Sequence, residues 1–218
     1  MITIVCAEVF GWDAAIRGMR NPMNSWDKSD SKCWRERIVG HTVEYRVVGT
    51  NDLALMKKLV KAGSDHAKFM RMINVTMDVT APLYWWKEVD TYRVGTVANS
   101  CSTMHTIANK EFKLYDFSHE HLMQGGLECL KNLCKDLNTC REQYLATHDK
   151  EWWWQIIQLL PSSYNQKRTV QLNYAVLRNM YHARKNHKLD EWRDFCSWVE
   201  SLPYAELITL GGDDNGKD

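Results

Sequence analysis

Hydrophobic and polar side chains alternate along residues 69–80, which form the clearest strand pattern in the chain. One face carries Ile73, Val75, Met77 and Val79, and the residues between them are polar. A two-residue period is typical of a strand with one buried face. We therefore predict a half-buried strand that leads into Pro82. Weaker strand patterns occur at the N-terminus, at 42–48 and around Val170 and Leu172.

Apolar residues recur every three or four positions elsewhere, which indicates amphipathic helices. The longest such pattern runs from Leu127 to Tyr144. Asp149 is placed to cap a following helix that Pro161 stops, and two more helices are expected at 174–184 and 189–202. Near the N-terminus we expect two helices, one capped by Asp13 and one by Asn51 or Asp52, with a loop over 22–34.

The stretch 82–105 combines a helix start with a run of small polar side chains. Pro82 suits the first helical position, and the helix should end near Arg93. Gly95 then breaks the pattern, and short hydroxyl, amide and thiol side chains follow. Such a segment can line a ligand pocket, and it can equally form a well-capped loop.

Composition indicates one soluble globular domain over 1–210, followed by a disordered polar tail over 211–218. Of the 218 residues 44% are hydrophobic and 25% charged, and the net charge of +1 gives no argument for binding a nucleic acid polymer or a membrane surface. No segment has the ~18 apolar residues of a membrane span. The seven cysteines lack the spacing of a zinc or redox motif, so we expect reduced thiols in the cytoplasm.

Most catalytic motifs are missing, and the remaining candidates have structural alternatives. The chain has no glycine-rich phosphate loop. His119 and His121 could share a metal, but residues two apart on a helix diverge, so solvent-facing histidines and no metal are expected. Cys101 could act as a nucleophile with His105 as its base, or it could simply line a pocket.

Amides and basic residues give a further set of candidates. His66 precedes the predicted strand, where a capping or surface role is the alternative to a site. Asn173, Asn179 and Arg184 lie on or beside the predicted helix at 174–184. Buried amides need partners, which the edge of a flavin or pyrimidine provides as well as a structural hydrogen bond does.

Two separated windows resemble the flavin-dependent thymidylate synthases. That family runs from a histidine through a strand and a proline-led helix to Arg-His-Arg-x-x-Ser-x-Asn-Glu-x-Ser-x-Arg-Tyr, an order that His66, the strand, Pro82 and Arg93 keep. The second window is similar to the family's Leu-Pro, an asparagine twelve residues on, and a helix with an arginine. The matching residues are Leu160, Pro161, Asn173, Leu177, Asn179 and Arg184.

The first window departs from the family's pattern at several positions. Thr91 and Tyr92 replace Arg-His, Ala98 and Asn99 replace Asn-Glu, and Thr103 and Met104 replace Arg-Tyr. Cys101 replaces a serine, Glu88 a substrate-binding glutamine, and Ile157 an arginine. Each charge-assisted hydrogen bond to phosphate is worth about 1.5 to 3 kcal/mol, so the lost arginines would weaken binding of dUMP.

The resemblance implies an α/β fold with a central mixed sheet flanked by long helices, assembled as a homotetramer that binds FAD between subunits. It implies that Arg184 is catalytic, stabilising negative charge on a pyrimidine. The implied flavin contacts are His66, Arg93, Thr96, Asn173 and Asn179. The implied nucleotide contacts are Glu88, Asn99, Cys101, Ser102 and Thr103.

The expected activity is therefore that of a thymidylate synthase-like enzyme acting at C5 of a pyrimidine deoxynucleotide. Methylene-tetrahydrofolate and a reduced nicotinamide are the implied co-substrates. Glu88 accepts hydrogen bonds only, which would suit the amino group of dCMP better than the carbonyl of dUMP. The alternatives are a non-catalytic homologue that keeps the tetramer, and an unrelated helical interaction protein.

Overall fold

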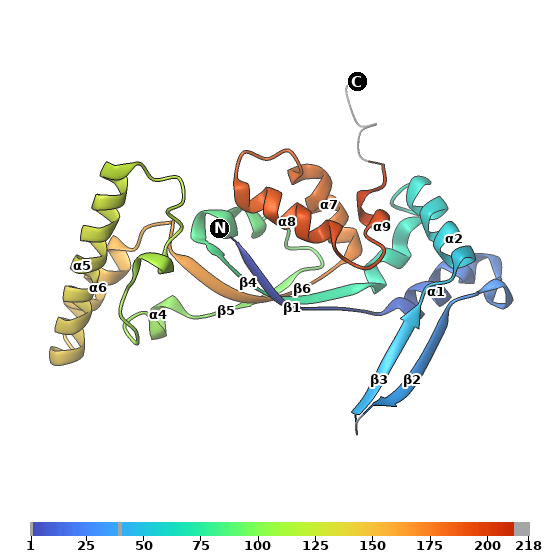
Figure 1. The fold of residues 1–218 in the computed structure, drawn as a ribbon, viewed down its shortest axis with the longest axis horizontal. Coiled ribbons are helices and arrows are strands. Elements are labelled where there is room, and N and C mark those ends of the chain that lie inside the picture. Colours follow the sequence, from blue (N-terminus) through green and yellow to red (C-terminus); the bar gives the residue numbers. More distant parts are fainter. Residues whose placement is uncertain (1, 39–40, 212–218) are drawn as a thin grey trace.

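A four-stranded sheet forms the centre of the computed structural model, which describes residues 2–38 and 41–211 (Figure 1). The strands are β1 (Thr3–Phe10), β2 (Lys32–Ile38), β3 (His41–Val47), β4 (Asn74–Pro82), β5 (Val97–Ser100) and β6 (Asn165–Asn173). The helices are α1 (Trp12–Arg20), α2 (Thr50–Lys61), α3 (Leu83–Val89), α4 (Thr103–Thr106), α5 (Gln124–Thr147), α6 (Lys150–Leu159), α7 (Tyr174–Arg184), α8 (Asp190–Glu200) and α9 (Glu206–Thr209). Short 3-10 turns connect them: η1 (Asn21–Met23), η2 (Trp26–Lys28), η3 (Ala67–Met72) and η4 (Leu114–Asp116).

The central sheet has the order β1-β4-β6-β5, and each neighbouring pair is antiparallel. The α/β class is confirmed, but the prediction of a mixed sheet is wrong for these strands. The alternation along β4 is confirmed, since Val75, Met77 and Val79 are buried and the intervening side chains are half-buried. Residues 69–72 belong to the 3-10 turn η3 instead of the strand.

Helices α3, α7 and α8 build the main core against the sheet. Trp85, Trp86 and Trp192 are almost completely buried, with exposed fractions of 1%, 1% and 0%. The ring centroid of Trp85 lies 4.9 Å from that of Trp86 and 5.1 Å from that of Trp192. Aromatic rings at these distances bury large apolar areas, which explains part of the high tryptophan content.

A second core lies at one end of the sheet, where α5 and α6 form an antiparallel hairpin (Figure 1). Leu137, Ile156 and Phe117 are buried there, with exposed fractions of 0%, 0% and 1%. Strand β6 leaves this hairpin and enters the main core, so it connects the two. The single domain over 1–210 stays a prediction. Over the described residues, no helix is long and apolar enough to span a membrane.

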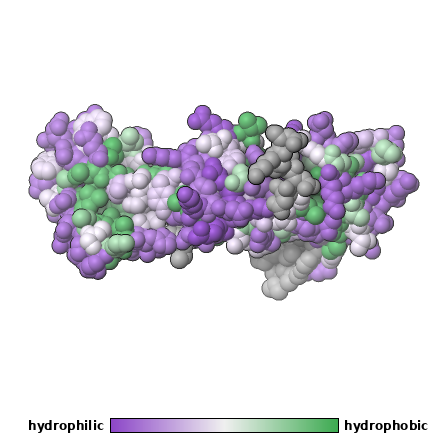
Figure 2. Space-filling model, turned by 90° about the horizontal axis from the view of Figure 1, so that it is seen from above, coloured by the Kyte–Doolittle hydropathy of each residue, from purple (hydrophilic) through white to green (hydrophobic). Residues whose placement is uncertain are grey.

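Apolar side chains also reach the surface at the end formed by α5 and α6, where Figure 2 shows a hydrophobic area. Leu145 on α5 and Trp154 and Leu159 on α6 are exposed. Large apolar side chains that gather at a surface are typical of contact sites between proteins. This end of the molecule is therefore a candidate for contact between copies of the chain.

The weak strand pattern at 42–48 is confirmed as β3, but the predicted loop at 22–34 contains η1, η2 and the start of β2. Strands β2 and β3 pair in a separate two-stranded ribbon. The ribbon projects from the end of the sheet opposite α5 and α6 (Figure 1). Three consecutive charged residues at 35–37 interrupt any alternation along β2, so this strand carries little sequence signal.

Two predicted helix caps are wrong, because other residues take their place. The N-cap of α1 is Gly11, in a left-handed conformation (φ +93°), and not Asp13. Helix α2 starts after Gly49, and its first N–H groups donate to Asp30 from the preceding loop. Asp52, which we expected to cap α2, is completely buried and binds Arg20 instead.

Boundaries in the stretch 82–105 also differ from the prediction. Pro82 ends β4 and is the N-cap of α3, which stops at Val89 and not near Arg93. Residues 97–100, expected in a loop, form the edge strand β5. Gly95 allows the chain to reverse direction between α3 and β5, because its φ is +79°, a value strained for residues with a Cβ atom. The predicted disordered tail lies outside the described residues, apart from Gly211.

The capping role of Asp149 is confirmed, and it gives a stability prediction. The Asp149 carboxylate accepts a hydrogen bond of 3.0 Å from the Glu151 N–H. We expect Asp149→Ala to lower the free energy of unfolding by about 1 kcal/mol, because one N-terminal donor of α6 loses its partner. Asp149→Asn keeps a capping acceptor and should differ little from the parent in urea denaturation. Equal losses in both variants would contradict the capping role.

Candidate functional site

Glu88 at the end of α3 meets Arg184 at the end of α7. Glu88 Oε2 accepts hydrogen bonds of 2.8 Å from Arg184 Nη1 and of 2.8 Å from Trp192 Nε1. Arg184 Nε donates to the hydroxyl of Tyr92 at 3.0 Å. The structure therefore brings the predicted catalytic arginine and a predicted nucleotide-binding residue into direct contact.

The surroundings of Arg184 fix its plane and compensate its charge. The guanidinium carbon lies 4.9 Å from the ring centroid of Trp192 and 5.7 Å from that of Tyr92. His187 Nε2 lies 3.5 Å from Glu88 Oε2, while its Nδ1 accepts the Leu189 N–H. Arg184 Nη2 and Glu88 Oε1 have no partner in the described part of the chain, and both side chains are partly exposed. A donor and an acceptor therefore lie side by side at the surface.

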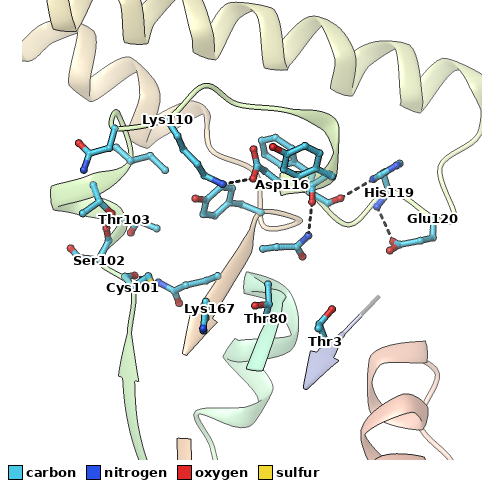
Figure 3. A pocket seen from close by; sticks show the side chains of 18 residues that line it. Thr3, Thr80, Cys101, Ser102, Thr103, Lys110, Asp116, His119, Glu120 and Lys167 are labelled. Atoms are coloured by element: carbon cyan, nitrogen blue, oxygen red, sulfur yellow. Dashed lines mark hydrogen bonds and ion pairs between the residues drawn. The ribbon is translucent and has the colours of Figure 1, made fainter. Parts of the chain in front are cut away.

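A cavity of about 670 Å³ lies between the start of β6, the loop after β5 and the loop before α5 (Figure 3). Three predicted nucleotide-binding residues, Cys101, Ser102 and Thr103, form one wall. Residues that the sequence did not single out form the opposite wall, among them Lys110, Asp116 and Tyr164. Its size is typical of small-molecule sites.

The polar side chains of this cavity offer hydrogen bonds to a ligand. The buried Asn165 Oδ1 accepts no hydrogen bond from the described residues. Burial raises the pKa of the Tyr164 phenol, so this hydroxyl stays protonated and can donate. The cavity can therefore satisfy a ligand with both donors and acceptors.

A second cavity, of about 440 Å³, lies between the end of α2, η3 and α7. Asn179 lines it and is exposed to solvent. Arg178 closes one side by donating to the carbonyl oxygens of Ile208, Leu210 and Gly211. The Asn179 amide can therefore hydrogen-bond to a ligand that offers both a donor and an acceptor.

A third cavity, of about 210 Å³, contains two predicted flavin contacts, Arg93 and Thr96. The Thr96 hydroxyl oxygen is buried without a partner in the described ranges. A buried hydroxyl without a partner costs free energy, which a bound ligand would recover. The unpaired Thr96 hydroxyl fits a polar group such as the edge of a flavin, which has donors and acceptors.

The remaining predicted residues lie outside these cavities. Asn173 caps α7 by accepting the Val176 N–H at 3.1 Å, and a Cβ atom on Gly95 would lie 3.1 Å from its amide nitrogen. His66 is exposed before η3, and Asn99 is exposed on β5. One chain thus gathers the predicted residues along α3, β5 and α7, but it does not enclose all of them in one cavity.

The two histidines considered as metal ligands have other partners. His119 Nδ1 donates to the Phe117 carbonyl oxygen at 2.8 Å, and His121 Nε2 lies 2.8 Å from Asp190 Oδ2. Across residues 2–38 and 41–211, no group of three histidine, cysteine or carboxylate side chains is arranged to hold a metal.

No family model and no curated protein matches this sequence. Two structures of thymidylate synthase X (ThyX) from Helicobacter pylori with FAD and dUMP are similar in fold. The first has a TM-score of 0.66 at 17% identity over 95% of this chain and 96% of that one, and the second 0.65 at 18% over 94% and 95%. A UMP/dUMP methylase, PolB from Streptomyces cacaoi, bound with 5-Br dUMP has a TM-score of 0.61 at 14% identity over 97% and 96%. The chain therefore has the flavin-dependent thymidylate synthase-like fold.

Proposed function

We propose that the protein is a flavin-dependent enzyme that modifies C5 of a pyrimidine deoxynucleotide. The observation that carries this proposal is the match of the whole fold, over 95% of the chain, to a synthase that holds FAD and dUMP. The placement of Arg184 beside Glu88, at the end of α7, supports it from the side of this chain. The thymidylate synthase-like prediction from sequence thus becomes the leading hypothesis for function.

The residues that would hold FAD are His66 before η3, Arg93 and Thr96 after α3, Asn173 at the end of β6 and Asn179 on α7. When bound, reduced flavin supplies hydride equivalents at the pyrimidine. Thr96, whose buried hydroxyl has no partner in the described chain, and Asn179, which lines the second cavity, would each hydrogen-bond to the cofactor. Arg184 would stabilise negative charge on the pyrimidine, because a guanidinium stays protonated at every working pH.

The nucleotide would lie between the Glu88–Arg184 pair and residues 99–103. Methylene-tetrahydrofolate and a reduced nicotinamide are the proposed co-substrates, and the cytoplasm the proposed location. The cavity lined by 101–103 does not include Glu88 or Arg184. We therefore propose that the two groups meet across copies in a homotetramer, which the exposed apolar side chains of α5 and α6 support. The unpaired Glu88 Oε1 would favour a pyrimidine that offers an N–H, which keeps dCMP beside dUMP as a substrate.

Flavin binding tests the proposal first. We expect purified protein to be yellow or to bind added FAD with a dissociation constant at or below tens of micromolar, seen as a shift in the visible spectrum. Asn179→Ala should weaken binding about tenfold, because one hydrogen-bonded amide is lost. Asn132→Ala, an exposed amide on α5, is the matched control. A colourless protein that binds no FAD would contradict the proposal.

Turnover assays test which pyrimidine nucleotide is the substrate. We expect tritium release from C5-labelled dUMP, dCMP or both when the assay contains FAD, a reductant and methylene-tetrahydrofolate. A clear preference for dUMP would remove dCMP from the proposal without affecting the flavin role.

One observation favours a second candidate, a non-catalytic homologue of the same fold. The 2.8 Å ion pair with Glu88 compensates the charge that Arg184 would otherwise offer to a developing anion. If the protein binds FAD or nucleotide but releases no tritium from either substrate, this candidate replaces the enzyme.

A further inference from the structure

We propose that Lys110 binds the phosphate of the nucleotide in the cavity of Figure 3. This inference rests on the proposed function, and it assigns a role to a residue outside the stretch that resembles the synthase signature. Thr103 stands where that signature has an arginine, so the wall formed by 101–103 has no cation of its own. Lys110 lines the same cavity and supplies one.

The structure holds Lys110 in place from both sides. Arg141 on α5 donates to the Ala108 carbonyl oxygen at 2.9 Å, just before the lysine. Just after it, the Asn138 side chain forms two hydrogen bonds with the backbone of Phe112, of 2.8 and 2.9 Å. A rigid backbone lowers the entropy that the lysine loses when a ligand binds.

Asp116 orients the ammonium group and uses only one of its N–H donors. Lys110 Nζ lies 2.5 Å from Asp116 Oδ1 (Figure 3). Asp116 Oδ2 accepts the Lys113 N–H at 2.9 Å. The carboxylate is buried, at 6% exposed, whereas the lysine is 63% exposed. Burial acts to lower the pKa of Lys110, but the hydrogen bond to Asp116 and the negative charge of this carboxylate together outweigh it and raise this pKa, so the amine stays charged. Two of its three N–H donors remain for a ligand.

Neutral groups around the lysine suit the rest of a sugar phosphate. The hydroxyls of Thr103 and Tyr164 have no hydrogen-bond partner in the described residues and can donate to phosphate oxygens. The unpaired, buried Asn165 Oδ1 needs a donor, which a sugar hydroxyl provides. The cavity thus matches a monoester phosphate on a hydroxylated sugar, and a base would extend out of it.

Isothermal titration with nucleotide and nucleoside pairs tests this role. The probes are dUMP and dCMP, each beside its nucleoside, and inorganic phosphate, with the full chain loaded with FAD. We expect Lys110→Met to weaken the preferred nucleotide about 10- to 100-fold and to leave its nucleoside unchanged, since one charge-assisted bond is lost. Lys110→Arg should retain most of the affinity. Lys113→Met, an exposed lysine three residues on and outside the cavity, is the matched control.

The outcomes separate this inference from the proposed function. Nucleotide binding that Lys110→Met leaves unchanged, or an equal loss for nucleotide and nucleoside, overturns the role of Lys110 and leaves the function standing. If the parent binds neither nucleotide, both fail. Circular dichroism of each variant shows whether a loss of nucleotide affinity comes from misfolding. If Lys110→Met is misfolded, Lys110→Arg decides the role of Lys110, because an arginine can still pair with Asp116 and should retain most of the affinity.

Discussion

Replacing Asp52 by alanine should lower the free energy of unfolding by about 3 to 5 kcal/mol, because it leaves a buried arginine without its counter-ion. Asp52 Oδ1 accepts from Arg20 Nε at 2.7 Å, and the two side chains are 0% and 4% exposed. Asp52 Oδ2 accepts from the hydroxyls of Ser29 and Ser31, each at 2.6 Å. Urea denaturation followed by circular dichroism measures the loss.

Asp27→Ala is the control, since Asp27 is an exposed aspartate on η2, just before Ser29 and Ser31, and it should change stability by less than about 0.5 kcal/mol. The double variant Arg20→Met/Asp52→Leu should recover part of the loss, because neither charge then stays buried alone. A loss below about 1 kcal/mol for Asp52→Ala would show that water reaches Arg20 and that the pair contributes little.

The contribution of Asp52 should also depend on pH. Burial acts to raise its pKa, but the hydrogen bonds from Ser29, Ser31 and Arg20 outweigh burial and hold the pKa below its ordinary value. A carboxyl with a lowered pKa in the folded state stabilises the protein above its unfolded pKa, about 3.9, and loses this contribution as the pH falls through the folded value. The difference between parent and Asp52→Ala should therefore be full near pH 7 and shrink below about pH 4.

Periodicity predicted the elements that bury one face, and little else. Strand β4 and helices α5 to α8 carry apolar patterns, because each packs on a core. Strand β2 carries charged residues in succession and gives no such pattern. The cap of α2 was assigned to a neighbour in sequence, whereas Asp30 reaches it from about twenty residues away through the loop that Arg20 and Asp52 hold. Long-range polar contacts of this kind leave no periodic signal.

The candidate site likewise contains residues that could be predicted from the sequence and residues that could not. Asn173, Asn179 and Arg184 could be selected from sequence because they lie on or beside one patterned helix. Their partners could not, since Tyr92 and Trp192 meet Arg184 only when α3 and α8 pack on α7. Lys110 lies in a segment that carries no periodicity, and only the fold places it in one cavity with 101–103.

Arg184→Met should reduce turnover of the preferred pyrimidine nucleotide by about 10²- to 10³-fold, as expected when a group that stabilises developing charge is removed. On the proposed function the loss should appear in kcat more than in KM, because the guanidinium acts on charge that forms during reaction. Tritium release from C5-labelled nucleotide measures both constants. Arg193→Met on α8, an exposed arginine paired with Asp190, is the control and should change kcat by less than about threefold.

The ion pair with Glu88 offers a second explanation for lost turnover in Arg184→Met, namely a loss of stability at the end of α3, and this explanation can be tested as well. Arg184→Met leaves the partly buried Glu88 carboxylate without its cation, which would itself destabilise the end of α3. Arg184→Met/Glu88→Gln removes that unpaired charge, so it should recover thermal stability while turnover stays low. If turnover returns with stability, the arginine holds α3 and α7 together and does not act on the substrate. If the double variant is stable but turns over far more slowly than Glu88→Gln alone, the chemistry is assigned to Arg184. In both variants Trp192 Nε1 can still donate to the amide oxygen of the substituted side chain and keep α3 against α8.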